Sequence, residues 1–233
     1  MRPIYLDNHA TTPLDPRVLE AMLPFLQESF GNPSSKSHPF GWEAERAVTT
    51  ARAQVAALIG ARPEEIVFTS GATESTNLAV KGLAARAAPG KRHIVTTTIE
   101  HKSVIDCCHH LEQSGFSVSF VAPGDDGVVP PAAILAALTD ETFLISVMLV
   151  NNEIGTIQPL AEIGAIANSR GIVVHSDAVQ GLGRVPFDVE SSGVGLVSIT
   201  GHKIYGPKGQ GALFVRRQPP VSLAPLFHCG SAE

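Results

Sequence analysis

The residues best suited to chemistry in this sequence come directly after short apolar segments. Lys203 lies between such a segment and the glycine-rich stretch 206–209, where a lysine sheltered from water can act as an amine nucleophile and form a Schiff base. Asp177 follows the apolar segment 172–176, and its carboxylate could bind a metal, cap a helix or pair with a cationic ring nitrogen. Since His175 and Asp177 have no further obvious ligands nearby, a metal is the weaker option.

Two further positions offer binding groups of other kinds. The run 70–75 follows one apolar segment and opens a helical one, so its free amides and the hydroxyl of Thr73 suit a phosphate. His101 could stack on a planar ligand or shuttle protons, and Gln180 could reach the same ligand as the acid three residues before it. Each feature alone also has a structural explanation, such as a capping turn for 70–75 or a helix start for His101.

Together these features match the requirements of pyridoxal 5′-phosphate (PLP). The lysine would hold the aldehyde, the acid would keep the pyridine nitrogen protonated, and the histidine would stack on the ring. The helix start would hold the phosphate. Four such features, each at the end of a predicted strand, are hard to explain by coincidence, so the sequence predicts a PLP site.

The elements that must position these residues alternate between strand and helix patterns. Strands separated by helices imply parallel crossovers, so we predict an α/β fold: a three-layer, mostly parallel sheet flanked by helices, with ligands at the carboxyl ends of the strands. The short connections after Val194 could carry an antiparallel strand. The patterns predict strands at 66–69, 93–98, 116–121, 143–150, 171–176, 194–200 and 212–215, and helices at 16–29, 42–59, 74–87, 102–114, 131–138 and 160–170.

Composition limits the class of protein and its partners. The chain has 233 residues, of which 44% are hydrophobic and 17% charged, which is enough apolar material for a sizeable core. The net charge of -5 and the lack of a basic block argue against nucleic acid or an anionic membrane as a partner. With no apolar signal region at the start, no bilayer-length apolar segment and an odd count of three cysteines, we expect a cytoplasmic protein.

Five stretches, residues 5–13, 31–34, 68–75, 150–155 and 201–209, closely resemble the cysteine desulfurases of the NifS/IscS type. These are fold-type I PLP enzymes of the class V aminotransferase-like group, and the resemblance extends over about residues 3 to 228. It implies that Lys203 binds the cofactor and abstracts the substrate α-proton, while His101 stacks on the ring and helps to transfer protons. The other implied cofactor contacts are Asp177 with the pyridine nitrogen, Gln180 with the phenolic oxygen, Asn152 near the ring, and Ala72, Thr73, Thr200 and His202 at the phosphate.

The resemblance also implies a reaction. L-Cysteine would be converted to L-alanine, with the sulfur left as a persulfide on an enzyme cysteine. That sulfur would supply iron–sulfur cluster assembly or tRNA thiolation through a sulfur-acceptor or scaffold protein, and the enzyme would form a homodimer. The alternatives are another class V activity, such as a selenocysteine lyase or an aminotransferase, and a non-catalytic PLP-binding remnant.

The sequence departs from the family pattern after its last predicted strand. We expect an N-terminal arm (1–15), a PLP-binding large domain (16–217) and a shortened tail (218–233) leading to an absent C-terminal small domain. In the family that domain carries the catalytic cysteine and the arginine that binds the substrate carboxylate. This chain is therefore expected to be weak or inactive alone, unless a separate chain supplies the small domain.

None of the three cysteines fits the role of the missing nucleophile. We interpret Cys107 and Cys108 as buried helical residues that behave as small hydrophobic side chains. Cys229 is interpreted as an exposed thiol, because its neighbours offer no cationic activation beyond His228. The apolar stretch 221–227 would be left exposed and would favour association.

Overall fold

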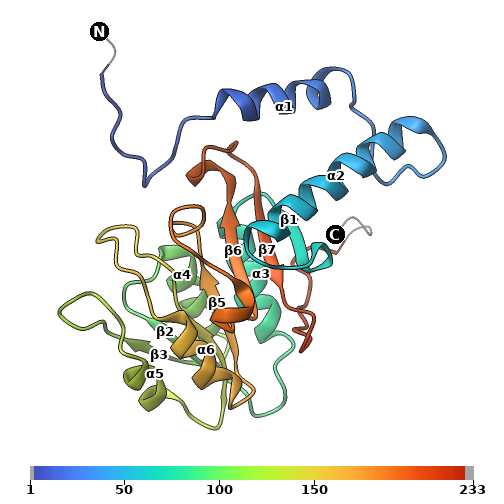
Figure 1. Cartoon of the computed structure of the whole chain (residues 1–233). Helices are drawn as coiled ribbons and strands as arrows, with labels where there is room; N and C mark the ends of the chain where they lie inside the picture. The colour runs from blue at the N-terminus through green and yellow to red at the C-terminus, as the bar shows by residue number, and fades with distance from the viewer. Residues whose placement is uncertain (1–2, 229–233) are drawn as a thin grey trace.

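A seven-stranded sheet forms the centre of the molecule. The computed structural model describes residues 3–228, and its strand order is β1-β7-β6-β5-β4-β2-β3 (Figure 1). Only β7 runs antiparallel to its neighbours β1 and β6, so the sheet is mostly parallel, and the antiparallel strand lies where the short connections after Val194 allow it. The strands are β1 (Ile66–Thr69), β2 (His93–Thr97), β3 (Ser117–Val121), β4 (Thr142–Ser146), β5 (Val173–Asp177), β6 (Leu196–Thr200) and β7 (Gly211–Val215).

Helices cover both faces of this sheet, which confirms the predicted three-layer architecture. Successive strand residues point to opposite faces, so Leu144 joins the apolar cluster under α3 and α4, whereas Ile145 joins the cluster under α5, α6 and α7. Within residues 3–228, no helix is long and apolar enough to cross a membrane. The helices are α1 (Pro16–Gln27), α2 (Pro39–Leu58), α3 (Ala72–Ala84), α4 (Lys102–Glu112), α5 (Pro131–Ala137), α6 (Leu160–Asn168) and α7 (Val189–Ser192).

The predicted elements differ from the structure by a few residues at several ends, and two differences are larger. The predicted strand 143–150 is too long, because β4 ends at Ser146, although the backbone of Val147 and Leu149 still donates to β5 carbonyls at 3.0 and 2.9 Å. Helix α7 was not predicted, since four residues are too few to show helical periodicity. Its local signals are an Asp188 cap that accepts from the Ser191 amide at 2.8 Å and a left-handed Gly193 at the end.

Large apolar side chains are exposed on α1 as well as in the tail, with Leu19, Leu23, Phe25 and Leu26 between 39% and 66% exposed. Figure 1 shows α1 standing away from the sheet, and none of its residues is buried. The prediction that the stretch 221–227 is exposed is wrong for Val221 and Leu223, which pack against the cluster under α3. The tail approaches α3 at Gly82, where a Cβ would lie 2.7 Å from the carbonyl oxygen of Ala224, so only a glycine accommodates this contact. Phe227 remains 74% exposed.

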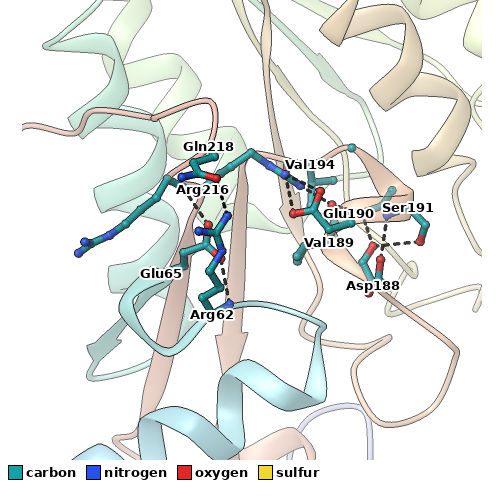
Figure 2. Close-up of polar contacts among 12 residues, drawn as sticks. Arg62, Glu65, Asp188, Val189, Glu190, Ser191, Val194, Arg216 and Gln218 are labelled. Atoms are coloured by element: carbon teal, nitrogen blue, oxygen red, sulfur yellow. Dashed lines mark hydrogen bonds and ion pairs between the residues drawn. The ribbon is translucent and has the colours of Figure 1, made fainter.

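The end of β7 is held by a buried arginine. As Figure 2 shows, the Arg216 guanidinium donates to the carbonyls of Val189 and Val194 at 2.5 and 2.9 Å and to both carboxylate oxygens of Glu190 at 2.9 and 3.0 Å. It also lies over the Phe214 ring, 5.8 Å from the ring centroid. Arg216 thereby ties the last strand to α7 and to the turn before β6.

Candidate active site

A cavity of about 890 Å³ opens at the carboxyl edge of the sheet. Its walls come from the segments that follow β1, β2, β4, β5 and β6, together with the N-terminal arm. This is the position at which α/β sheets bind ligands. The structure brings all nine predicted site residues together around this one cavity: Ala72, Thr73, His101, Asn152, Asp177, Gln180, Thr200, His202 and Lys203.

The start of α3 forms one end of the cavity. Its cap residue, Gly71, has a φ of 152°, which favours glycine, and it makes no side-chain capping bond, so the amides of the following turn remain available to a ligand. Gly211 lies directly behind this loop, and a Cβ there would come within 2.6 Å of the Gly71 Cα. Free helix amides and the neighbouring hydroxyl of Thr200 together suit an anion such as a phosphate.

Asp177 and His101 come from adjacent parts of the same edge. Asp177 ends β5, is only 5% exposed, and accepts a hydrogen bond from the Val179 amide at 3.0 Å. Burial raises the pKa of Asp177, and this is opposed by the Val179 amide and by the electrostatic influence of His101 and Lys203. The Nδ1 atom of His101 accepts from the Ser103 amide at 3.2 Å, so this residue caps α4 and lines the cavity at once.

Lys203 lies on the short helical turn η2 (Gly201–Lys203) after β6, beneath the N-terminal arm. Its Nζ atom donates to the main-chain carbonyl of His9. The sequence prediction of a sheltered lysine holds only in part, because the side chain is partly exposed. Burial still lowers the pKa of Lys203, and Arg184 lowers it further, whereas Asp177 and Asp7 act in the opposite direction.

Gln180 is fixed by the groups around it. Its Nε2 atom donates to the His9 carbonyl at 2.9 Å, and its Oε1 atom accepts from Arg184 at 2.7 Å. Arg184 also donates to the Lys203 carbonyl at 2.9 Å, which links the loops after β5 and β6. A primary amide carries two donor hydrogens, so Gln180 keeps one for a ligand.

Asn152 and His202 lie at the edges of the cavity. Asn152 points its amide nitrogen toward the Glu153 carboxylate, at 2.6 Å. The Nδ1 atom of His202 lies 3.1 Å from the Thr11 hydroxyl. Burial, with the nearby charges of Lys203 and Lys208, lowers the pKa of His202.

The N-terminal arm is the part of the site that the residue-by-residue interpretation missed. The Thr12 hydroxyl donates to the His202 carbonyl at 2.9 Å and accepts from the Tyr205 amide at 2.8 Å. The His9 ring lies 3.0 Å from the Asn152 carbonyl, so the arm bridges the loops after β4 and β6. The only sequence signal was the stretch 5–13, which carried the family resemblance without an assigned role.

The cysteines that the structure describes are unsuited to nucleophilic attack. Cys107 and Cys108 are buried in α4, which confirms the prediction, and burial raises their pKa values to about 11 and about 12. A thiol with such a pKa is almost entirely protonated near neutral pH. Cys229 lies outside the described residues.

The fold and the cavity at the carboxyl edge of its sheet are those of an α/β enzyme. The chain belongs to the class V aminotransferase family, whose model matches residues 4–232. Members of that family and the cysteine desulfurases are PLP enzymes.

Similar proteins carry the name cysteine desulfurase or NifS. The cysteine desulfurase IscS of Rickettsia bellii (strain OSU 85-389) is 56% identical over 231 residues, which are 99% of this chain and 56% of that protein. A solved NifS-like protein matches 98% of this chain and 62% of its own, with a TM-score of 0.94 and 42% identity. A structure of SspA in complex with cysteine matches 98% of this chain and 65% of its own chain, with a TM-score of 0.94 and 43% identity. The chain spans about half the length of the curated relatives it matches.

Proposed function

We propose that this chain is the PLP-binding large domain of a cysteine desulfurase. The observation that carries the proposal is the convergence of Lys203, Asp177 and the start of α3 on one cavity. In the proposed organisation, residues 1–15 are an arm, 16–217 the large domain and 218–233 a tail toward a further domain. The similarity to IscS proteins, and to SspA in complex with cysteine, supports the same substrate.

The residues of the cavity fit PLP at each of its functional groups. The amides of Ala72 and Thr73, with the side chains of Thr73, Thr200 and His202, would hold the phosphate. Asp177 would hold the ring nitrogen, His101 would stack on the ring, and Gln180 would donate its second amide hydrogen to the phenolic oxygen. When bound, PLP supplies an electron sink for the amino acid carbon next to the carboxylate.

Lys203 and His101 are the groups that would move protons. A lysine amine can accept a proton only when it is neutral, and the lowered pKa of Lys203 increases that fraction. His101 is held in place by Ser103, so its ring can face the ligand without losing its orientation. Asn152, at the cavity wall, would lie near the ring and the substrate.

The proposed reaction transfers a sulfur atom to a thiol. The C–S bond of L-cysteine breaks, the carbon gains a proton to give L-alanine, and an S–S bond forms to the accepting thiol, giving a persulfide. Since Cys107 and Cys108 are buried with raised pKa values, the accepting thiol must come from elsewhere. We therefore propose that turnover by this chain alone is weak, and that a partner domain or an added thiol increases it.

The proposed cellular role is sulfur supply for iron–sulfur clusters or tRNA thiolation. A cytoplasmic homodimer would pass sulfur to an acceptor or scaffold protein, without direct contact with nucleic acid or membrane. The name IscS of the similar proteins supports the link to iron–sulfur clusters.

PLP titration of the purified chain tests the cofactor site. We expect absorption at longer wavelength than free PLP, and covalent attachment at Lys203 that borohydride traps and peptide mass spectrometry locates. Lys203→Ala should lose both signals, while Lys36→Ala, at an exposed lysine, should keep them. Equal attachment to the parent and to Lys203→Ala would overturn the assignment of Lys203.

Substrate tests with dithiothreitol then separate the candidate activities. A cysteine desulfurase releases sulfide and alanine from cysteine in equal amounts. Preference for selenocysteine, or transfer of an amino group to a keto acid, would replace the proposed reaction by one of the other class V activities. Rapid sulfide release that Cys229→Ser abolishes would show that Cys229 is the accepting thiol.

A further inference from the structure

A second buried acid, Glu100, directly precedes the cavity residue His101 but does not itself line the cavity. It is 6% exposed, and its Oε1 atom accepts from the Thr97 hydroxyl at 2.7 Å and from the Met148 amide at 2.9 Å. Among residues 3–228 its other oxygen, Oε2, is buried and has no hydrogen-bond partner. Glu100 therefore connects the end of β2 to the segment after β4, from which Met148 lines the cavity.

The surroundings of Glu100 favour the uncharged acid. A buried carboxylate needs a cation or several donors, and one oxygen of Glu100 has neither within the described part of the chain. Burial raises the pKa of Glu100 to about 8; the Thr97 and Met148 donors oppose this shift, and the charge of Asp177 adds to it. The titratable groups that face it are Asp177 from β5 and Cys108 from α4.

Asp177 and Glu100 are thus neighbouring buried acids whose surroundings favour different charge states. Asp177 has the Val179 amide and the positive charge of the nearby Lys203 to support its ionised form. Among residues 3–228, no such cation supports Glu100. Two neighbouring buried carboxyl groups that repel each other ionise one at a time, and the one with the better partners ionises first.

We propose that Glu100 is a positioning residue of the site: it is an uncharged acid that fixes the Met148 backbone at the cavity, and Asp177 is the ionised member of this buried pair of acids. The part that concerns PLP rests on the function proposed above. The part that concerns the charge of Glu100 does not, so the two parts are tested separately.

Methyl NMR of the PLP-free chain tests the charge of Glu100. The chain has three methionines, so the buried Met148 methyl is readily assigned with Met148→Leu. We expect this resonance to shift with a midpoint near pH 8 in the parent, and to stay constant in Glu100→Gln, whose amide mimics the neutral acid. Glu20→Gln, at an exposed position on α1, should keep the parent titration. A constant Met148 signal in the parent, or an unchanged titration in Glu100→Gln, overturns the proposal.

PLP affinity at pH 7 tests the positioning role. Glu100→Gln should bind PLP within about twofold of the parent, whereas Glu100→Ala should bind about tenfold more weakly, since it releases the Met148 amide. Circular dichroism first establishes conditions in which both variants are folded, and PLP affinity is measured under those conditions. Equal affinity of the parent and both variants overturns the role. If the parent binds no PLP, the proposed function fails and the cofactor part of this proposal fails with it, while the NMR result still decides the charge of Glu100.

Discussion

Lys203 and Gln180 donate hydrogen bonds to the same acceptor, the main-chain carbonyl of His9. One carbonyl of the N-terminal arm thus orients two side chains that follow different strands. The arm is held in turn by Thr12, which is buried and bonded to both sides of the lysine turn. The orientation of the site should therefore depend on a residue that does not line the cavity.

Removing the Thr12 hydroxyl should weaken both stability and PLP binding. In Thr12→Val the Tyr205 amide loses its acceptor, so we expect a loss of about 1–2 kcal/mol in the free energy of unfolding. PLP should bind several-fold more weakly, because the arm no longer holds Lys203 and Gln180. Urea unfolding and PLP titration measure the two effects. Thr49→Val, an exposed change of the same type, is the control, and equal PLP affinity in both variants would contradict the role of the arm.

A buried histidine should make the fold sensitive to acid. The His175 ring bridges Ser146 and Ser198 at 2.8 and 2.9 Å across three strands, and burial lowers its pKa to about 3. The unfolded chain takes up this proton near pH 6.5, so the contribution to stability is complete above pH 6.5 and is lost as the pH falls toward 3. At pH 4 we expect a loss of about 3 kcal/mol.

Urea unfolding at pH 7 and pH 4 measures this dependence. His175→Gln should be less stable at pH 7 but should lose less stability on acidification than the parent. His110→Gln, at an exposed histidine, should follow the parent at both pH values. An identical pH dependence in the parent and His175→Gln would show that this histidine does not control acid unfolding.

Arg216 should contribute to stability mainly through its backbone contacts. The Glu190 side chain is 66% exposed, so this ion pair alone is worth little. In Arg216→Ala the buried carbonyls of Val189 and Val194 lose their donor, and we expect a loss of about 2–4 kcal/mol. Urea unfolding measures it against Arg46→Ala, an exposed arginine on α2. A loss below about 1 kcal/mol would contradict the importance of these contacts.

Cys107 and Cys108 should resist thiol reagents in the folded chain. In a Cys229→Ser background at pH 8, we expect a disulfide reagent to react at least about 100-fold more slowly than with a free thiol, because few thiolates form at these pKa values. Both thiols should react at once in denaturant. Rapid modification of the native protein would mean that α4 opens readily.

The sequence predicts the site well where a local pattern marks it. Apolar strands alternate with helices, and polar residues follow each strand, so the sheet and the cluster of Asp177 and Lys203 at its edge can both be predicted. The contacts of the N-terminal arm pair residues nearly two hundred positions apart, such as Thr12 and His202, and no local pattern signals them. Glu100 could not be predicted for another reason: the backbone amide that binds it belongs to Met148, which lies on a different segment.

The place of β7 in the sheet has a consequence for synthesis on the ribosome. The first strand, β1, pairs only with β7, the last strand of the sheet, which in turn separates β1 from β6. The backbone N–H and C=O groups on the pairing side of β1 therefore have no strand to bond with until almost all of the described chain has emerged. We expect nascent chains that lack β7 to bind chaperones, and the helix start that faces the cavity to become rigid only when β7 is inserted.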